Sequence, residues 1–425
     1  MLDLLVIGAG LAGLSAAITA AKAGWQVRII AKGMGVTHWH AGTLDVLGYL
    51  PATDERVQTP LVTSQTLTAD HPYRLLGAQR LHDNLATFRS WLTNSGLGYG
   101  GATNPDQNIL LPSPVGAARP TWLAPAAQLA GALNRPEPML IVGFRGLRDF
   151  YPQLITENLT RQGYAARAAF LPLALISDLH DRNPVQLAEA LEAPARQAEL
   201  AAALKEIWRS GERIGLPALL GINEHPTIWS ALQSQTGAPI FEIPTLPPSV
   251  PGIRLYRALR QQLNDAGGRI ETNMEAIGFH ADGNRIRWVE TATSARPIKH
   301  YARHFLLATG GLLGGGFSSD HTGRCWETIF NLPLTIAQDR NAWFHHQFLH
   351  PQGQPVFTGG VAVNSAFQPV DQNGACCYDN LWAAGGVLAA TDPIRERSLE
   401  GIAVATGIAA AQASMNTTTD SESNR

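Results

Sequence analysis

Residues 4–24 read LLVIGAGLAGLSAAITAAKAG, in which Gly8, Gly10 and Gly13 follow the order G-x-G-x-x-G. An apolar run ends directly before these glycines, and an alanine-rich helical pattern begins directly after them. Glycine at these positions allows a tight turn, a close approach of the backbone to a pyrophosphate, and close packing of the helix on the strand. A second strand pattern, WQVRIIAKG at residues 25–33, follows at the distance that a βαβ unit requires. The stretch therefore predicts a Rossmann-like α/β domain whose first helix holds phosphates with its exposed amides.

The same stretch is nearly uncharged, so a secretory signal and a membrane-spanning helix are its competing interpretations. A secretory signal has a positively charged first region, whereas this chain opens with Met1, Leu2 and Asp3. A spanning helix needs about 20 apolar residues. Here Lys22 interrupts the run and the glycines weaken the helix. We therefore expect the nucleotide turn, with any membrane contact made through a partner.

The composition indicates a globular protein that binds its ligands locally. The 425 residues, 45% hydrophobic and 16% charged, suffice for two domains or for one domain with a large insertion. The 32 Lys and Arg residues nearly balance the 34 Asp and Glu residues, so no strong field attracts nucleic acid or an anionic membrane. Cys325, Cys376 and Cys377 are too few for a disulfide framework or a four-thiolate iron–sulfur cluster. We expect no metal site, and a cytoplasmic location fits.

Changes of pattern along the chain predict its domains. Strand and helix patterns alternate after the proline- and alanine-rich stretch Leu110–Ala130, which we expect to cross between domains. We expect 110–240 to be an inserted α/β substrate or cap domain, and 1–109 with 241–414 to form a discontinuous flavin-binding domain. The polar end, 415–425, is expected to be disordered.

Motifs spread along most of the chain resemble a known family. They are the opening glycines, HAGTLDVLGYLP (40–51), HPYRLL (71–76), TWL (121–123), IVGFRGLRDF (141–150), PTLPPSVPGIRL (244–255), LLATGG (306–311) and AAGGVLAATDPI (383–394). From about residue 1 to 395 the chain resembles the B subunit of anaerobic glycerol-3-phosphate dehydrogenase. The motif at 244–255 is the most specific, because the glycine motifs would fit any flavoprotein.

The resemblance implies a flavoprotein that works with two partners, a catalytic A subunit and an iron–sulfur, membrane-associated C subunit. Such a complex carries electrons from glycerol 3-phosphate towards quinone, which would place this chain on the inner face of the membrane through a partner. The family is very rich in glycine after DPI, whereas this chain has Arg395, Glu396 and Arg397 there. The partner interface or the acceptor route is therefore expected to differ.

Three glycine turns favour a flavin over a nicotinamide, because a flavin dinucleotide is long enough to touch all of them. They lie at Gly8–Gly13, Gly310–Gly311 and Gly385–Gly386. In flavoproteins of this build, a helix N-terminus near the third turn stabilises the anionic reduced flavin at its N1/C2=O edge, and we place it at Gly385–Val387. The expected cofactor residues are Gly8, Gly10, Leu11, Ala12, Gly13, Ala31, Lys32, His38, His40, Ala41, Gly42, Thr43, Ala308, Thr309, Gly310, Gly311, Gly385, Gly386 and Val387.

The acid that normally binds the adenosine ribose is missing from the sequence. A Rossmann site has Asp or Glu about 20 residues beyond the glycines. This chain has Ala31 and Lys32 there. The resemblance implies FMN, whereas a pyrophosphate turn implies a dinucleotide. The chain also resembles, more loosely, the succinate dehydrogenase and fumarate reductase flavoproteins. These have lysine or a neutral residue at this position and bind FAD. We therefore predict FAD, with FMN as the alternative.

Two histidines follow the second strand. His38 matches a histidine of the family, and His40 is particular to this chain. Related flavoproteins carry a flavin-linked histidine in this region, so a covalent 8α-histidyl link is one interpretation. Hydrogen bonding to phosphate or to the loop itself is the other.

Oxidation of glycerol 3-phosphate needs a base for the hydroxyl proton and cations for the phosphate. Histidines and arginines gather in SDHTGRCWE (319–327) and WFHHQFLH (343–350). The catalytic candidates are His321, Arg324, His345, His346 and His350 from this cluster, and Arg254 from the GIRL motif.

Three functions remain open on the sequence alone. The chain is an enzyme subunit of a glycerol-3-phosphate dehydrogenase complex, an electron-transfer flavoprotein subunit without a substrate site, or a stand-alone flavin dehydrogenase of a small hydroxy acid or amine.

Overall fold

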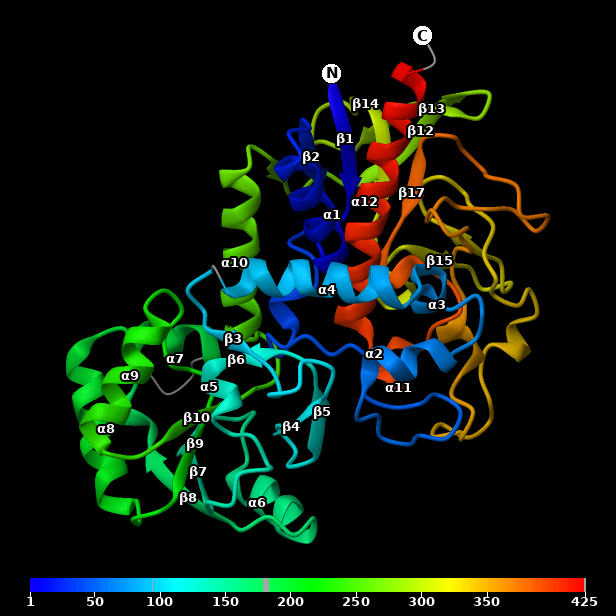
Figure 1. Ribbon diagram of the computed structural model, residues 1–425. Coiled ribbons are helices and arrows are strands. Elements are labelled where there is room, and N and C mark those ends of the chain that lie inside the picture. The colour runs from blue at the N-terminus through cyan, green and yellow to red at the C-terminus, as the bar shows by residue number, and fades with distance from the viewer. Residues whose placement is uncertain (94, 179–182, 424–425) are drawn as a thin grey trace. The chain divides into compact units, whose positions relative to one another are not determined.

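A computed structural model describes residues 1–93, 95–178 and 183–423. Two compact units make up the chain: unit 1 contains Met1–Val36, Asp45–Phe88 and Leu259–Arg425, and unit 2 contains Thr37–Leu44 and Arg89–Ala258 (Figure 1). Unit 2 is longer than the expected insertion of 110–240 at both ends and includes a separate piece near the N-terminus. The role of a substrate or cap domain stays a prediction.

Helices α4 (Ala78–Thr93) and α10 (Val250–Asp265) pass from one unit into the other. The strands of unit 1 are β1 (Leu2–Ile7), β2 (Val27–Ile30), β11 (Arg269–Glu271), β12 (Ala276–Asp282), β13 (Arg285–Thr291), β14 (Ile298–Leu307), β15 (Phe317–Ser319), β16 (Cys325–Glu327) and β17 (Leu381–Ala383). Its helices are α1 (Leu11–Lys22), α2 (Pro60–Thr63), α3 (Pro72–Leu76), α11 (Pro393–Glu396) and α12 (Leu399–Ser423). Its 3-10 turns are η2 (Ser64–Thr66), η4 (Leu312–Gly314), η5 (Arg340–Ala342), η6 (Pro355–Thr358) and η7 (Gly385–Val387).

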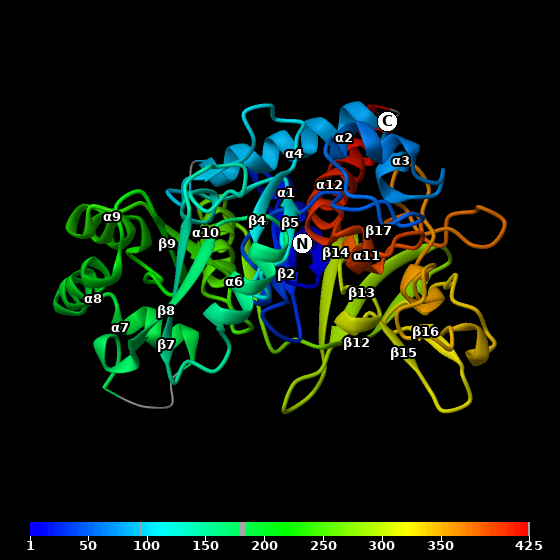
Figure 2. The ribbon, with the colours of Figure 1, turned by 90° about the horizontal axis from the view of Figure 1, so that it is seen from below.

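The main sheet of unit 1 has the order β11-β2-β1-β14-β13-β12, with β17 also paired to β14. Strands β11, β2, β1, β14 and β17 are parallel neighbours, whereas β12, β13 and β14 form an antiparallel meander (Figure 2). The apolar stretch from Leu4 to Ile7 is buried, as is typical of an interior strand in a parallel sheet whose faces are covered. A hairpin that turns at Gly283 joins β12 to β13.

Helices α1 and α12 lie side by side in unit 1 (Figure 1). Small residues permit this contact, since a Cβ at Gly407 would lie 2.4 Å from the carbonyl oxygen of Ala12. Helix α12 continues to Ser423, whereas 415–425 was expected to be disordered; residues 424–425 lie outside the described residues. None of the helices within the described residues has both the length and the apolar character that a bilayer crossing demands.

Unit 2 contains a parallel sheet of order β10-β9-β7-β8. Its strands are β3 (Tyr99–Gly100), β4 (Ile109–Pro112), β5 (Ala118–Thr121), β6 (Ala124–Pro125), β7 (Met139–Arg145), β8 (Ala166–Pro172), β9 (Arg213–Pro217) and β10 (Ile240–Ile243). Its helices are α5 (Ala126–Leu129), α6 (Pro152–Arg161), α7 (Pro184–Ala190), α8 (Pro194–Ile207) and α9 (His225–Thr236), with 3-10 turns η1 (Thr37–Trp39) and η3 (Leu173–Leu175).

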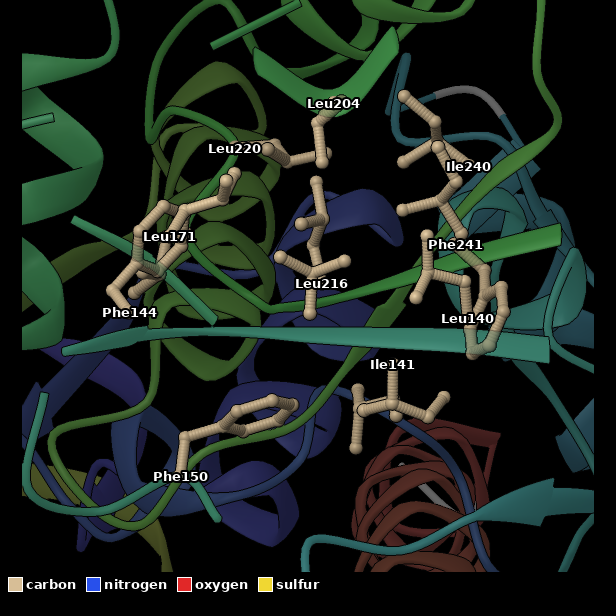
Figure 3. Close-up of a cluster of buried hydrophobic side chains, with 14 of the residues drawn as sticks. Leu140, Ile141, Phe144, Phe150, Leu171, Leu204, Leu216, Leu220, Ile240 and Phe241 are labelled. Carbon is tan, nitrogen blue, oxygen red and sulfur yellow. The ribbon is translucent and has the colours of Figure 1, made fainter. Parts of the chain in front are cut away.

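The core of unit 2 lies around this parallel sheet. Side chains from β7, β8, β9, β10 and α8, among them Leu140, Leu171, Leu216, Phe241 and Leu204, gather into one cluster (Figure 3). The stretch Leu110–Ala130 forms the β4–β5 hairpin, β6 and α5 inside unit 2. Its prolines fit these short strands because an edge strand tolerates proline.

Candidate functional site

The carboxyl ends of the parallel strands in unit 1 meet at one edge of the sheet. Ile7 of β1 is in register with Ile30 of β2 and Leu307 of β14, and Leu307 is in register with Ala383 of β17. Each of these ends is followed by a predicted cofactor segment. Open α/β sheets bind their ligands in the crevice outside such strand ends.

A cavity of about 450 Å³ opens at this edge, entirely within unit 1. This volume is within the range of about 300–1,000 Å³ that small-molecule sites usually have. Its walls come from Ile7, Gly8, Ala9, Gly10, Ala31, Lys32, Gly33, Gly35, Val36, Met274, Glu275, Ala276, Ile277, Ala308, Thr309, Gly310, Gly314, Gly315, Thr328 and Ile329. The first two predicted glycine turns and the end of β2 therefore line one space.

Backbone packs directly on backbone at the first glycine turn. Gly8 has φ 118°, and a Cβ there would lie 2.2 Å from the carbonyl oxygen of Ala308. A Cβ at Gly13 would lie 1.9 Å from the carbonyl oxygen of Gly8. Gly10 differs, because within the described part of the chain no atom comes within 4 Å of its would-be Cβ. Gly8 and Gly13 are therefore required by the fold, while Gly10 leaves its space open for a ligand.

The third glycine turn lies beside the second. A Cβ at Gly311 would lie 2.4 Å from the carbonyl oxygen of Gly386, and a Cβ at Gly385 would lie 2.6 Å from the Cβ of Ala12. The structure thus brings Gly8–Gly13, Ala308–Gly311 and Gly385–Val387 together. Leu11 and Ala12, by contrast, are buried core residues of α1.

The helix start expected at the third turn is not found there. Gly385–Val387 forms the single 3-10 turn η7, and the amide of Gly385 donates to Thr406 Oγ1. The next long helix, α12, begins only at Leu399. A long-helix dipole therefore does not start at Gly385.

The residues at the cavity fit a flavin dinucleotide. The open backbone at Gly10 suits a pyrophosphate. Among the described residues, the Thr309 hydroxyl oxygen is buried without a hydrogen-bond partner, and Thr309 lines the cavity. A buried hydroxyl without a partner is costly, so a polar ligand group would satisfy it.

A buried acid supports the part of the cavity wall formed by Thr328 and Ile329. Glu327 is 1% exposed, and its carboxylate accepts hydrogen bonds from the amides of Ile329 (3.0 Å) and Phe330 (2.6 Å). Burial raises the pKa of Glu327 above its ordinary value, against the effect of these amides. Glu327 thus fixes the turn that carries Thr328 and Ile329 to the cavity.

The predicted residues His38–Thr43 belong to unit 2. There they rest on the start of α10: the carbonyl oxygen of His38 accepts from the amide of Ser249, and a Cβ at Gly252 would lie 2.7 Å from the carbonyl oxygen of His40. Thr43 accepts a hydrogen bond from Arg119, which is 5% exposed. A covalent histidyl link remains a prediction.

Arg254 is part of a buried network in unit 2. Its guanidinium donates to both carboxylate oxygens of Glu242, at 2.7 and 3.1 Å, and to the carbonyl oxygen of Gly221. His225 lies 3.1 Å from the same carboxylate. Burial alone would raise the pKa of Glu242, but the charges of Arg254 and His225 and their hydrogen bonds hold it well below its ordinary value. This geometry makes Arg254 a structural partner of Glu242.

The other catalytic candidates lie on loops of unit 1. His321, Arg324 and His346 are exposed, and the rings of His345 and His350 stack at 3.8 Å. Among the described residues, those that line the cavity include no member of this cluster. The structure therefore does not bring the predicted base and cations to the cavity of unit 1.

Sequence reasoning missed several lining residues. The largest group is Met274–Ile277, which leads from β11 into β12. Its only signal in the sequence was its position after a short strand pattern. Gly33, Gly35 and Val36 also line the cavity, directly after the predicted Ala31 and Lys32.

Comparison with known proteins gives consistent matches. The model of the FAD binding domain family matches residues 3–402. A probable B subunit of anaerobic glycerol-3-phosphate dehydrogenase from Halobacterium salinarum is 33% identical over 423 residues, which is 97% of this chain and 97% of that protein. The B subunit of anaerobic glycerol-3-phosphate dehydrogenase from Yersinia pestis is 30% identical over 422 residues, which is 96% of this chain and 97% of that protein.

Among solved structures, the open conformation of a flavocytochrome c3 fumarate reductase is similar with a TM-score of 0.45 and 11% identity. The similarity covers 98% of this chain and 78% of that chain.

Proposed function

The chain belongs to the FAD binding domain family and to the B-subunit family of anaerobic glycerol-3-phosphate dehydrogenases, and on this basis we propose that it is the flavin-dependent oxidoreductase subunit of such a complex. Its family confirms the predicted flavoprotein fold and the prediction of FAD over FMN. FAD supplies the capacity to accept a hydride or two electrons.

The observation that carries the proposal is the similarity to B-subunit proteins over nearly the full length of both chains. The cavity at the strand ends supports it, because the glycine turns provide the backbone cradle that a dinucleotide needs. We infer that electrons from glycerol 3-phosphate pass through this FAD towards quinone.

The proposed partners are a catalytic A subunit and an iron–sulfur C subunit. The proposed location is the cytoplasmic side of the membrane, with attachment through a partner. A relative named as one subunit of an enzyme supports a multi-subunit assembly, and the low net charge of this chain gives no reason for it to bind a membrane directly.

For the chemistry, we propose that the cluster of His321, Arg324, His345 and His346 supplies a base and phosphate-binding cations. Its exposure in unit 1 means that substrate or partner would have to meet these loops. Arg254 is better explained as the support of Glu242, so we no longer propose it as a phosphate ligand.

The position of these residues favours a second function. The candidate base and cations lie on exposed loops and do not line the cavity. As the second candidate we therefore propose an electron-transfer flavoprotein subunit whose catalytic partner oxidises the substrate.

Anaerobic bleaching of the flavin tests these proposals. The full-length flavoprotein is mixed with glycerol 3-phosphate, small 2-hydroxy acids and amines, each with and without the catalytic partner. Bleaching by glycerol 3-phosphate alone supports the enzyme subunit, and bleaching only with the catalytic partner supports the electron-transfer subunit. Bleaching by another donor alone would instead identify a stand-alone dehydrogenase and contradict both.

A further inference from the structure

The end of β2 carries a lysine where a Rossmann site usually carries the acid for the adenosine ribose. The structure brings an acid to this place from elsewhere in the chain. Lys32 Nζ lies 2.7 Å from Glu275 Oε1, and both residues line the cavity.

The backbone holds Glu275 beside the end of β2. Strand β11 runs parallel to β2, with Glu271 in register with Ile30. Asn273 then adopts a left-handed conformation with φ 60°, which asparagine tolerates better than most residues. The amide of Met274 donates to the carbonyl oxygen of Ala31 at 2.9 Å. The chain is thereby tied to β2 one residue before Glu275.

A second main-chain hydrogen bond holds Glu275 itself, from the end of β13. The amide of Ala292, just beyond β13, donates to the carbonyl oxygen of Glu275 at 2.8 Å. The carboxylate is therefore attached to a fixed backbone, although its side chain remains 49% exposed.

We propose that Glu275 binds the adenosine ribose hydroxyls of FAD, and that Lys32 is a positioning residue that holds its carboxylate. An ionised carboxylate has about four lone-pair sites, so an ion pair through one oxygen leaves acceptors for ribose hydroxyls. Lysine cannot accept these hydrogen bonds, but it can orient the group that does. This inference depends on FAD binding and not on glycerol 3-phosphate being the electron donor.

An ion pair on the surface would be the competing explanation for these two residues. Such pairs contribute little to stability and nothing to the choice between cofactors. FMN lacks the adenosine ribose, so a ribose contact affects FAD and leaves FMN unchanged. The ratio of the two affinities therefore separates a ribose ligand from a surface ion pair.

The test uses full-length protein stripped of flavin and titrated with FAD, and separately with FMN, by quenching of flavin fluorescence. We expect Glu275→Ala to raise the Kd for FAD about tenfold, as expected for loss of a hydrogen bond to a charged group, and to change the Kd for FMN less than about twofold. Glu275→Gln keeps one acceptor and should have a smaller effect on FAD.

Glu271→Ala is the matched control. Glu271 lies four residues earlier, pairs with Arg28 at 3.3 Å, and is not among the lining residues. It should leave both affinities unchanged. Lys32→Met should also raise the Kd for FAD. The double variant should bind FAD no more weakly than Glu275→Ala alone.

The proposal would be overturned if Glu275→Ala raised the Kd for FAD and the Kd for FMN equally, or changed neither. Donor specificity is not measured in this titration, so its failure is distinct from a failure of the bleaching experiment.

Discussion

The carbonyl oxygen of Ala308 occupies the space that a side chain at Gly8 would need, 2.2 Å from the would-be Cβ. Gly8 directly follows β1, and Ala308 directly follows β14. The contact therefore joins two cofactor-binding turns that lie far apart in the sequence.

Gly8→Ala should destabilise the fold and abolish FAD binding. The backbone at Gly8 has a φ of 118°, which alanine rarely adopts, and the new Cβ would collide with the backbone of Ala308. Rotation of a side chain relieves neither problem. We expect a loss of about 2–4 kcal/mol in the free energy of unfolding, measured by urea denaturation. Gly10→Ala is the control: its Cβ meets open space, so it should keep the apoprotein stable while lowering FAD affinity. Equal stability of the two variants would contradict this explanation.

Arg254→Ala should act on stability rather than on substrate binding. It would leave the carboxylate of Glu242, which is 1% exposed, without its guanidinium, a change that typically costs about 3–5 kcal/mol. Chemical denaturation measures this loss. Arg257→Ala removes an exposed arginine of the same helix, which bonds Asn223, and should cost less than about 1 kcal/mol. A stable Arg254→Ala protein with a raised KM would restore Arg254 as a phosphate ligand.

His304 should make the protein less stable as the pH falls below 6.5. Burial, and then the charge of Arg285, lower its pKa to about 4. An unfolded histidine has a pKa of about 6.5, so between these values the unfolded chain binds a proton that the folded chain does not. The free energy of unfolding should therefore drop by about 3 kcal/mol between about pH 6.5 and pH 4.

His304→Phe removes this titration and keeps an aromatic ring near Trp25 and Trp382. Unfolding measured across this pH range should show a shallower slope for the variant than for the wild type. A wild-type slope in the His304→Phe protein would assign the loss to another group.

Substitutions in the histidine cluster should slow turnover without affecting FAD binding. The double variant with His345→Ala and His346→Ala changes an exposed loop, so its FAD content and its free energy of unfolding should equal those of the wild type. If the cluster carries the chemistry, reduction by glycerol 3-phosphate should slow at least about 100-fold, as expected for loss of a general base. Unchanged reduction in the presence of the catalytic partner would assign the chemistry to that partner.

The sequence alone predicted the elements whose signals are local. The turn at Gly8–Gly13 and the end of β14 could be predicted because glycines follow apolar strand patterns there. Glu275 could not, since its partner Lys32 is brought beside it only by the pairing of β11 with β2. The partners of Arg254 were missed for the same reason, because Glu242 and His225 come from different elements of unit 2.

The pairing of β17 with β14 also has a consequence during synthesis. Strand β1 is translated long before its neighbour β14 and before β17, which pairs with β14. The edge that cradles the cofactor therefore stays incomplete until translation has passed Ala383. Flavin loading should therefore follow the synthesis of β17, and nascent chains truncated before Ala383 should be colourless.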